Sequence, residues 1–405
     1  MPRRLSQPEF IAMIAMLFAT IAFTIDAMLP ALPQIGQELS PDNLNRAQLI
    51  LTSFVLGMGV GTFFTGPLSD AFGRKPVIMA GALLYCLSAA AAWAAQSLEL
   101  LLVARFLQGL GAAGPRVVAI AIVRDLYEGR QMAKLMSLVM LIFTLVPAIA
   151  PTLGAGIIAL VGWRGIFGAF VGFSVISAIW VGTRQSETLA PEARRPLRAP
   201  VLWAAVVEVI STPMVRLSIA VQTLCMAMLF SVLSSTQQVY DVTFGRGDSF
   251  PLWFAFTALI AATASMINAA VVVRLGMRYL VTLALGGQIL LSGAMLLISL
   301  TGPWPEAVAF PAWFIWTTSV FFMVGLTMGN LNALAMEPMG HIAGMAASII
   351  SAMATVVSVF LAAPVGLAFD GTPLPLAAAV LVFAVIGFAL IRRMARLERV
   401  VMRAE

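Results

Sequence analysis

The sequence is poor in charge, with only 10% Asp, Glu, Lys and Arg among 405 residues. Hydrophobic residues make up 61%, and the mean hydropathy is +0.98. A soluble domain of this composition would expose far too much apolar surface to water. Apolar runs of about 18 or more residues recur along the chain, and none shows the alternation of a strand. The sequence therefore predicts an all-α integral membrane protein and favours a helical bundle over a β-barrel.

Other scarce residues exclude several kinds of chemistry. The two cysteines, Cys86 and Cys225, lie in apolar runs of different halves, which favours buried free thiols over a disulfide. The one histidine, His341, has a single acidic neighbour in sequence, Glu337, and such a pair is expected to be a solvated loop pair and not a metal site. There is no Walker A sequence, no serine–histidine–acid set and no Cys/His cluster. We therefore expect no enzyme, no ATP-driven machine and no cofactor.

The net charge of +6 and pI near 10 are explained by membrane topology and do not require a nucleic-acid partner. One set of expected loops is rich in arginine and lysine, from Arg3 and Arg4 through Arg74 and Lys75 to the tail arginines that begin at Arg392. The alternate set holds only Arg46, Arg164 and Arg246. With an even number of spans, the positive-inside rule places both termini in the cytoplasm. The membrane is expected to be the inner membrane.

Hydropathy predicts about twelve spans. They lie near 10–30, 47–67, 77–95, 99–123, 134–159, 164–182, 213–235, 251–273, 279–300, 310–335, 342–365 and 374–391. The first contains Asp26 and is too long for the apolar region of a signal peptide, so we expect an uncleaved helix.

The longest polar stretch divides the predicted spans into two sets of six. The expected organisation is a first bundle at 1–182, a cytoplasmic linker at 183–212, a second bundle at 213–391 and a basic tail at 392–405. Within the linker, the apolar stretch 200–212 is too short to span and favours a helix in the membrane interface. Arg274–Arg278 follows the eighth span as a charged turn follows the second, which indicates two repeated halves.

The charged turn after the second span is the most specific motif. It reads Gly66-Pro67-Leu68-Ser69-Asp70-Ala71-Phe72-Gly73-Arg74-Lys75-Pro76 and is expected to be a loop at the membrane surface. Its order resembles the loop between helices 2 and 3 of the major facilitator superfamily. Further segments narrow the resemblance: Thr24–Ile35, Arg105–Ala113, Val123–Tyr127, Ala150–Gly154 and Gly162–Arg164. Together they resemble the twelve-helix drug:proton antiporters, most of all the bicyclomycin/chloramphenicol resistance subgroup.

This resemblance is strong over about 20–170 and thinner in the second half, where Ala335–Pro338 and Ala343–Ala346 are its best points. Three positions depart from the family pattern: Ala71 stands where an arginine is usual, Ala150 stands where a glycine is usual, and Arg116 has no family counterpart that we identify.

The resemblance implies two pseudo-symmetric six-helix bundles around a central site. It further implies a monomeric secondary transporter in the lipid bilayer that exports drugs or small amphipathic or zwitterionic metabolites by alternating access, driven by the proton gradient. Two alternatives stay open: an importer of the same fold, acting as symporter or uniporter, and a membrane sensor that binds a ligand without transporting it. The sensor is expected to carry an appended soluble domain, which this sequence lacks.

The charged turn predicts a conformational latch on the cytoplasmic side. Glycines permit a close approach of the two helices, and Arg74 is expected to pair with Asp125 at the end of the fourth span. In the resembled family the turn aspartate also meets the N-terminus of helix 11. The residues assigned to this latch are Gly66, Asp70, Gly73, Arg74, Lys75 and Asp125.

Asp26 is the one acidic residue placed firmly within a span, where a carboxylate must be paired or protonated. Arg105 is expected at a similar depth, and it stays charged. We expect Asp26 and Arg105 to share a network in which proton and substrate compete, with a purely structural pair as the alternative. Arg116 lies three turns below Arg105; it either faces the same cavity, which would favour an anionic or zwitterionic substrate, or reaches the interface with its long side chain.

In the resembled fold, helices 1, 4, 7 and 10 line the cavity. The resemblance therefore implies a substrate cavity that combines these charges with polar and adaptable apolar side chains from those helices. Its candidate residues are Phe23, Asp26, Arg105, Arg116, Gln222, Met226, Phe230, Trp316, Met323 and Asn330. Helix 5 is expected to be interrupted at a hinge formed by Pro147, Pro151 and Gly154, which the resemblance links to exchange and which otherwise is a simple bend.

Overall fold

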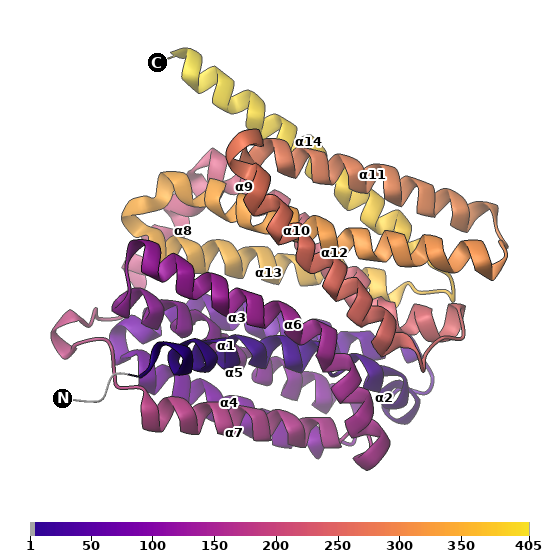
Figure 1. Ribbon diagram of the computed structural model, residues 1–405, viewed down its shortest axis with the longest axis horizontal. Coiled ribbons are helices and arrows are strands. Elements are labelled where there is room, and N and C mark those ends of the chain that lie inside the picture. The colour runs from indigo at the N-terminus through magenta and orange to yellow at the C-terminus, as the bar shows by residue number, and fades with distance from the viewer. Residues whose placement is uncertain (1–4, 405) are drawn as a thin grey trace. The chain divides into compact units, whose positions relative to one another are not determined.

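The computed structural model describes residues 5–404, and over these residues the chain is built from helices alone. Arg3 and Arg4, used above for the expected orientation, lie outside the described residues, as do the side chains from residue 398 onward. The chain forms two compact units, Met1–Val201 and Leu202–Glu405. Figure 1 shows each unit as a bundle of long helices, coloured indigo to magenta in the first and pink to yellow in the second.

The long helices of the first unit are α1 (Gln7–Asp26), α3 (Leu49–Phe72), α4 (Arg74–Trp93), α5 (Leu98–Leu126), α6 (Gly129–Val161) and α7 (Gly165–Arg184). A short helix, α2 (Leu32–Leu39), follows α1. The unit boundary falls within α8 (Ala199–Ser211), a helix of 13 residues in the region where a short interfacial helix was expected.

The long helices of the second unit are α9 (Pro213–Gln238), α10 (Phe250–Leu275), α11 (Met277–Thr301), α12 (Glu306–Met336), α13 (Ala343–Leu367) and α14 (Leu374–Ala404). Eleven helical stretches of the described chain are long and apolar enough to cross a membrane, and one of them, Glu306–Leu367, contains both α12 and α13. The predicted fold class is therefore confirmed, and each predicted span has its helix, with most ends displaced by a few residues. The exception is α14, which continues through the predicted basic tail to Ala404.

The two units repeat one pattern of helix contacts. In the first, α5 packs on α3, α4 and α1, while α7 packs on α4 and α1, and α6 packs on α1. In the second, α12 packs on α10, α11 and α9, while α14 packs on α11 and α9, and α13 packs on α9. Each contact of one unit thus has its counterpart in the other. This correspondence is the structural form of the repeat that the basic turns indicated.

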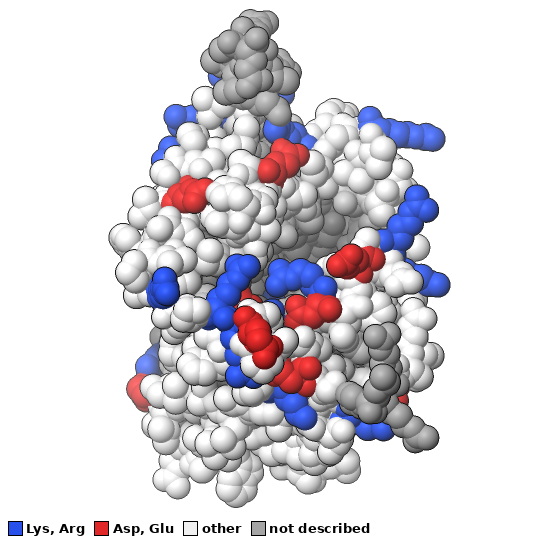
Figure 2. Space-filling view, turned by 90° about the vertical axis from the view of Figure 1, so that its left-hand side faces the viewer, with Lys and Arg blue, Asp and Glu red and all other residues white. Residues whose placement is uncertain are grey.

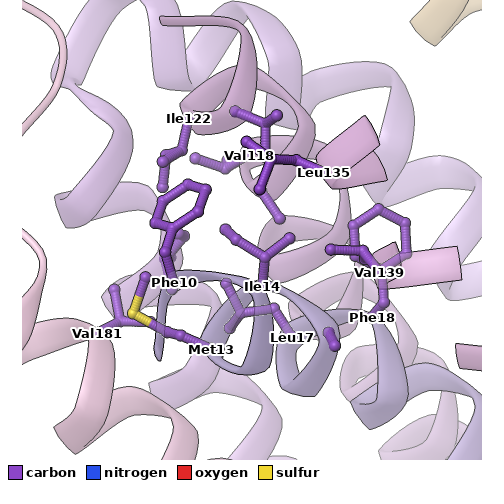
Figure 3. Packing of buried hydrophobic residues seen from close by; sticks show 14 residues of the cluster. Phe10, Met13, Ile14, Leu17, Phe18, Val118, Ile122, Leu135, Val139 and Val181 are labelled. Carbon is purple, nitrogen blue, oxygen red and sulfur yellow. The ribbon is translucent and has the colours of Figure 1, made fainter. Parts of the chain in front are cut away.

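Helices α1 and α9 are the buried helices of their units, whereas the others turn apolar side chains outward. Figure 3 shows how α1 is enclosed: Phe10, Ile14 and Leu17 face Val118 and Ile122 of α5, Leu135 and Val139 of α6, and Val181 of α7. Exposed side chains such as Leu87, Leu290 and Val273 are typical of helices whose outer faces contact lipid.

Three sequence expectations need correction. The first span does not continue to residue 30: α1 ends at Asp26, because Pro30 and Pro33 begin a 3₁₀ turn and then α2. The segment 66–76 is not a loop, since α3 continues through Pro67 to Phe72 and α4 begins at Arg74. Helix α6 is not interrupted, and Pro147 and Pro151 lie inside one continuous helix.

The turn between α3 and α4 is therefore a single residue, Gly73, with φ of 104°. Gly276 joins α10 to α11 in the same way, with φ of 82°. Both conformations lie in the left-handed region that favours glycine. Two long antiparallel helices can then follow one another with no intervening loop.

Helices α3 and α5 touch through paired glycines. A Cβ atom at Gly57 would lie 1.9 Å from the carbonyl oxygen of Phe106, and one at Gly109 would lie 2.0 Å from that of Phe54. Small residues at such crossings let two backbones approach closely. The helices are held further by Ser53, whose hydroxyl donates to the carbonyl of Leu102 at 2.7 Å.

We expect Gly57→Ala to destabilise the protein by about 2 kcal/mol or more, because the added methyl meets rigid backbone and forces the helices apart. Thermal unfolding of the purified protein in detergent measures this change. The matched control is Gly156→Ala on α6, where nothing lies within 4 Å of the added carbon. Equal unfolding temperatures for the two variants would show that the α3–α5 crossing relaxes freely.

Candidate functional site

Arg105 lies at the centre of a polar cluster between α1, α3, α4 and α5. Its side chain is fully buried, at 0% exposure. The guanidinium donates to Oε1 of Gln108 at 2.7 Å, and more weakly to the carbonyl oxygens of Thr24 and Ile50, both at 3.4 Å. It also lies 4.5 Å from the centre of the Phe54 ring, in cation–π geometry. These contacts fix the guanidinium and leave its charge without an anion.

The absence of a counter-charge is the unusual feature of this cluster. Within the described part of the chain, no carboxylate forms an ion pair with Arg105. A buried charge without a partner is strongly unfavourable, and carbonyl dipoles compensate only part of the lost hydration. Such an arginine is suited to receive an anionic group that arrives during function.

Two further groups complete the cluster. The hydroxyl of Tyr85, on α4, lies 2.5 Å from the hydroxyl of Thr24, on α1, and both side chains are buried. The amide nitrogen of Gln108 is buried and lies toward the hydroxyl of Tyr85, but it makes no hydrogen bond of good geometry to a described residue. Poorly satisfied buried donors are rare in folded proteins, so this nitrogen is a second group available to an acceptor.

Asp26 is the last residue of α1 and is 5% exposed. Its carboxylate has no hydrogen bond or ion pair with any other described residue. The C-terminal end of a helix carries partial negative charge, which opposes an ionised carboxylate there. The structure shows no direct contact between Asp26 and Arg105; the arginine contacts the carbonyl of Thr24 instead. Their expected coupling therefore stays a prediction.

The other charged and aromatic candidates of the first unit lie in different surroundings. Arg116 is on α5, and its side chain is exposed. No hydrogen bond or ion pair to it occurs among residues 5–404. Phe23 packs edge-on against Phe170 and tilted against Phe173 of α7, with ring centres 5.5 and 5.4 Å apart. Phe23 thus contributes to packing within the unit.

Six candidates lie in the second unit, on α9 and α12. Trp316 donates from its indole to Ser292 at 3.0 Å, and Asn330 donates to Asn268 at 2.7 Å. These two side chains are held by internal hydrogen bonds. Gln222 differs, since no described residue donates a hydrogen bond to its buried Oε1. Phe230 and Met323 are buried and Met226 is half-buried.

Arg74 connects three helix ends of the first unit. Its Nη1 donates to Asp70 at 2.5 Å and to Ser69 at 2.8 Å, and its Nε donates to Asp125 at 2.9 Å. The expected contact between Arg74 and Asp125 is present.

Lys75 donates from Nζ to the carbonyl of Gly182 at 2.5 Å. Figure 2 shows basic and acidic side chains intermingled on one face of the molecule. Of the other assigned latch residues, Gly66 lies inside α3 and Gly73 forms the turn.

The linker contributes an acid that the sequence reasoning did not assign. Glu187 accepts hydrogen bonds from the backbone N–H groups of Arg74 at 2.9 Å and Lys75 at 3.0 Å. It also accepts from those of Thr188 and Leu189, both at 3.0 Å. Burial alone would raise the pKa of the Glu187 carboxyl, but the donated N–H groups outweigh burial and hold the pKa below its ordinary value of 4.5.

On α6, Gly154 lies against the turn that follows α1. A Cβ atom there would lie 2.2 Å from the carbonyl oxygen of Ala27. Ala27 directly follows Asp26, so α6 touches the chain at the end of α1. The assigned role of Pro147, Pro151 and Gly154 as a hinge stays a prediction.

His341 does not pair with Glu337, which corrects the expected loop pair. Its Nε2 lies 2.6 Å from Oε1 of Glu208 on α8, and both side chains are partly exposed. Among the described residues there is no group of three or more His, Cys, Asp and Glu side chains able to hold a metal ion. Cys86 and Cys225 are free thiols.

Comparison with known proteins agrees with this architecture. A family model described as Major Facilitator Superfamily matches residues 12–363. The crystal structure of a D-xylose-proton symporter superposes with a TM-score of 0.71 at 14% identity, over 93% of this chain and 97% of that one. At that identity the likeness shows the fold alone.

Two relatives agree with the predicted subgroup. A bicyclomycin resistance protein homolog of Haemophilus influenzae is 30% identical over 352 residues, which are 85% of this chain and 85% of that protein. A chloramphenicol resistance protein of Pseudomonas aeruginosa is 34% identical over 204 residues, which are 50% of this chain and 46% of that protein. The chain therefore belongs to the major facilitator superfamily, a family of membrane transporters and not of enzymes.

Proposed function

We propose that this transporter exports drugs or small amphipathic or zwitterionic metabolites in exchange for protons. The observation that carries the proposal is a pair of buried groups of opposite charge type in one unit, Asp26 and Arg105. Neither forms an ion pair with a described residue. Relatives named for resistance to bicyclomycin and chloramphenicol support drugs as the substrate class.

In the proposed cycle, proton and substrate compete for one set of groups. A proton entering from outside neutralises Asp26, which weakens the binding of a substrate and releases it outward. Deprotonation on the cytoplasmic side restores the affinity. Both ligands then bias one equilibrium between two conformations, which is sufficient for alternating access without a cofactor. The proton gradient supplies the energy.

We assign the remaining candidates to this cycle as part of the same proposal. Arg116 and the side chains named on α1, α9 and α12 would contact substrate, and Gln222 supports this assignment best because its buried oxygen lacks a donor. Arg74 with Asp70 and Asp125 would hold the cytoplasmic end shut in one conformation. The basic loops favour cytoplasmic termini in an inner membrane, and we expect a monomer.

Substrate flux in proteoliposomes under an imposed pH gradient tests this function. The test compounds are chloramphenicol-like molecules and zwitterionic or anionic drugs. We expect substrate to move against its gradient, in the direction opposite to the protons. Movement in the same direction as the protons would identify an importer, and binding without flux would identify a sensor.

A further inference from the structure

The linker acid Glu187 contacts the first turn of α4. Helix α4 begins directly after Gly73. Because glycine has no side chain, the residue at this N-cap position cannot accept a hydrogen bond from the first N–H groups of the helix. The first N–H groups of any helix lack intrahelical acceptors and carry partial positive charge. Glu187 satisfies two of them, at Arg74 and Lys75, with its two oxygens. The cap of α4 thus comes from more than one hundred residues further along the chain.

Gly73 leaves the room that this contact needs. A Cβ atom at Gly73 would lie 2.7 Å from Oε2 of Glu187, which is too close for two non-bonded atoms. The positive φ of Gly73 and the approach of the carboxylate therefore require glycine for separate reasons.

The linker contacts the same charged residues at two further points. The hydroxyl of Thr188 donates to Oδ2 of Asp125 at 2.9 Å, the same oxygen that accepts from Nε of Arg74. The backbone N–H of Arg195 donates to the carbonyl of Asp70 at 2.9 Å. The linker therefore meets both carboxylate residues between which Arg74 lies.

We propose that Glu187 is a positioning residue for Arg74: by holding the backbone at the start of α4, it keeps the guanidinium between Asp70 and Asp125. The linker then helps to hold the charge cluster formed by Arg74, Asp70 and Asp125, in addition to connecting the two units. This inference rests on the proposed function in one respect: the role of Arg74, Asp70 and Asp125 in the transport cycle is part of that proposal.

The test compares Glu187→Gln with Glu192→Gln, a neutralisation in the same linker at an exposed side chain. A glutamine keeps the shape but can accept with only one of its two terminal atoms, so one N–H of α4 loses its acceptor. We expect the maximal transport rate of Glu187→Gln to fall about tenfold with an unchanged KM, since the change lies away from the proposed substrate groups. Glu192→Gln is expected to match the wild type.

Two further measurements separate positioning from a general loss of structure. If Glu187 acts through Arg74, the double variant Glu187→Gln/Arg74→Gln is no slower than Arg74→Gln alone. Trypsin cleavage after Arg194 reports on the linker directly, since the bond after Arg195 precedes Pro196 and resists trypsin. We expect cleavage after Arg194 to be about tenfold faster in Glu187→Gln. Gel filtration and circular dichroism confirm that each variant is folded.

The outcomes distinguish this inference from the proposed function. A wild-type transport rate in Glu187→Gln, or multiplicative effects in the double variant, would overturn the inference even where Arg74→Gln and Asp125→Asn are slow. If the wild type shows no proton-driven flux, the proposed function fails, and the protease measurement alone then decides whether Glu187 anchors the linker. Unchanged cleavage in Glu187→Gln would overturn that anchoring as well.

Discussion

Replacing Asp26 by asparagine is expected to reduce transport driven by a pH gradient to the level of empty vesicles. Asparagine has nearly the same shape as a protonated aspartic acid, but it cannot bind or release a proton in the working pH range. The variant should therefore behave as a transporter fixed in its proton-loaded form. The measurement is substrate flux in proteoliposomes with an imposed pH gradient.

The structure gives a reason why this substitution should leave the fold intact. The Asp26 carboxylate accepts no hydrogen bond from a described residue, so asparagine leaves no donor without its acceptor. Removal of a poorly hydrated carboxylate at a helix C-terminus also removes an unfavourable charge. We therefore expect an equal or higher unfolding temperature in detergent.

Two comparisons make the result specific to coupling. Exchange of substrate across the vesicle membrane without a gradient needs no net proton movement. It should persist in Asp26→Asn at a raised substrate concentration, because the proton-loaded form binds substrate more weakly in the proposed cycle. Asp42→Asn, in an exposed loop of the same unit, should transport as the wild type does. Gradient-driven flux that survives in Asp26→Asn would move the coupling site to another residue.

The fold was largely predictable because membrane insertion constrains it so strongly. A span needs a long apolar run, and each of the twelve runs became a helix at the expected place. Several helices are longer than their runs, and α14 continues to Ala404 through the predicted basic tail. The errors arose where local chemistry competes with hydropathy. Pro30 ended α1 early although the apolar run continues past it, whereas Pro67 and Pro151 did not end their helices. A hydropathy profile does not distinguish a proline that ends a helix from one that the helix accommodates.

The candidate site was only partly predictable, because charge pairing depends on positions that are distant in sequence. The motif around Arg74 indicated its contact with Asp125, since both residues flank helix ends on the same side. No local signal indicated Glu187, which lies in a polar linker with other acids and bases. An uncapped helix start after Gly73 does imply an acceptor from elsewhere, but the sequence does not identify which acid supplies it.

For Arg105 the position was predictable but the surroundings were not. A buried arginine on a membrane helix suggested a carboxylate partner, and Asp26 at similar depth was the natural choice. The structure instead surrounds Arg105 with Gln108, two backbone carbonyls and an aromatic ring. Which residue contacts Arg105 depends on which side of α1 faces α5, as well as on depth in the membrane. The side of α1 that faces Arg105 presents the carbonyl of Thr24.

The second large effect is expected at this arginine. We expect Arg105→Met combined with Gln108→Leu to abolish transport while unfolding at an equal or higher temperature than the wild type. Replacing a buried charge and its polar partner by apolar groups of similar size is often neutral or stabilising, by about 1 kcal/mol or more. Thermal unfolding in detergent and gradient-driven flux measure the two halves of this prediction.

The single variants show why both side chains are changed together. Gln108→Leu alone removes the shortest hydrogen bond of the guanidinium, 2.7 Å, and leaves the charge in a dry site. It should therefore lower stability by about 2 kcal/mol. Arg105→Met alone leaves the Gln108 oxygen without its donor, while the amide nitrogen already makes no hydrogen bond of good geometry. The double variant removes both defects and should be more stable than either single variant.

Arg46→Met is the matched control, since Arg46 is a partly exposed arginine of the same unit, paired with Glu99 at 2.8 Å. An exposed ion pair of this kind contributes little to stability, so both measurements should stay near the wild type. If the double variant at Arg105 and Gln108 unfolds well below the wild type, the arginine serves mainly to hold α1 and α3 through their carbonyls. Loss of transport with stability retained would instead mean that this uncompensated charge is kept for function.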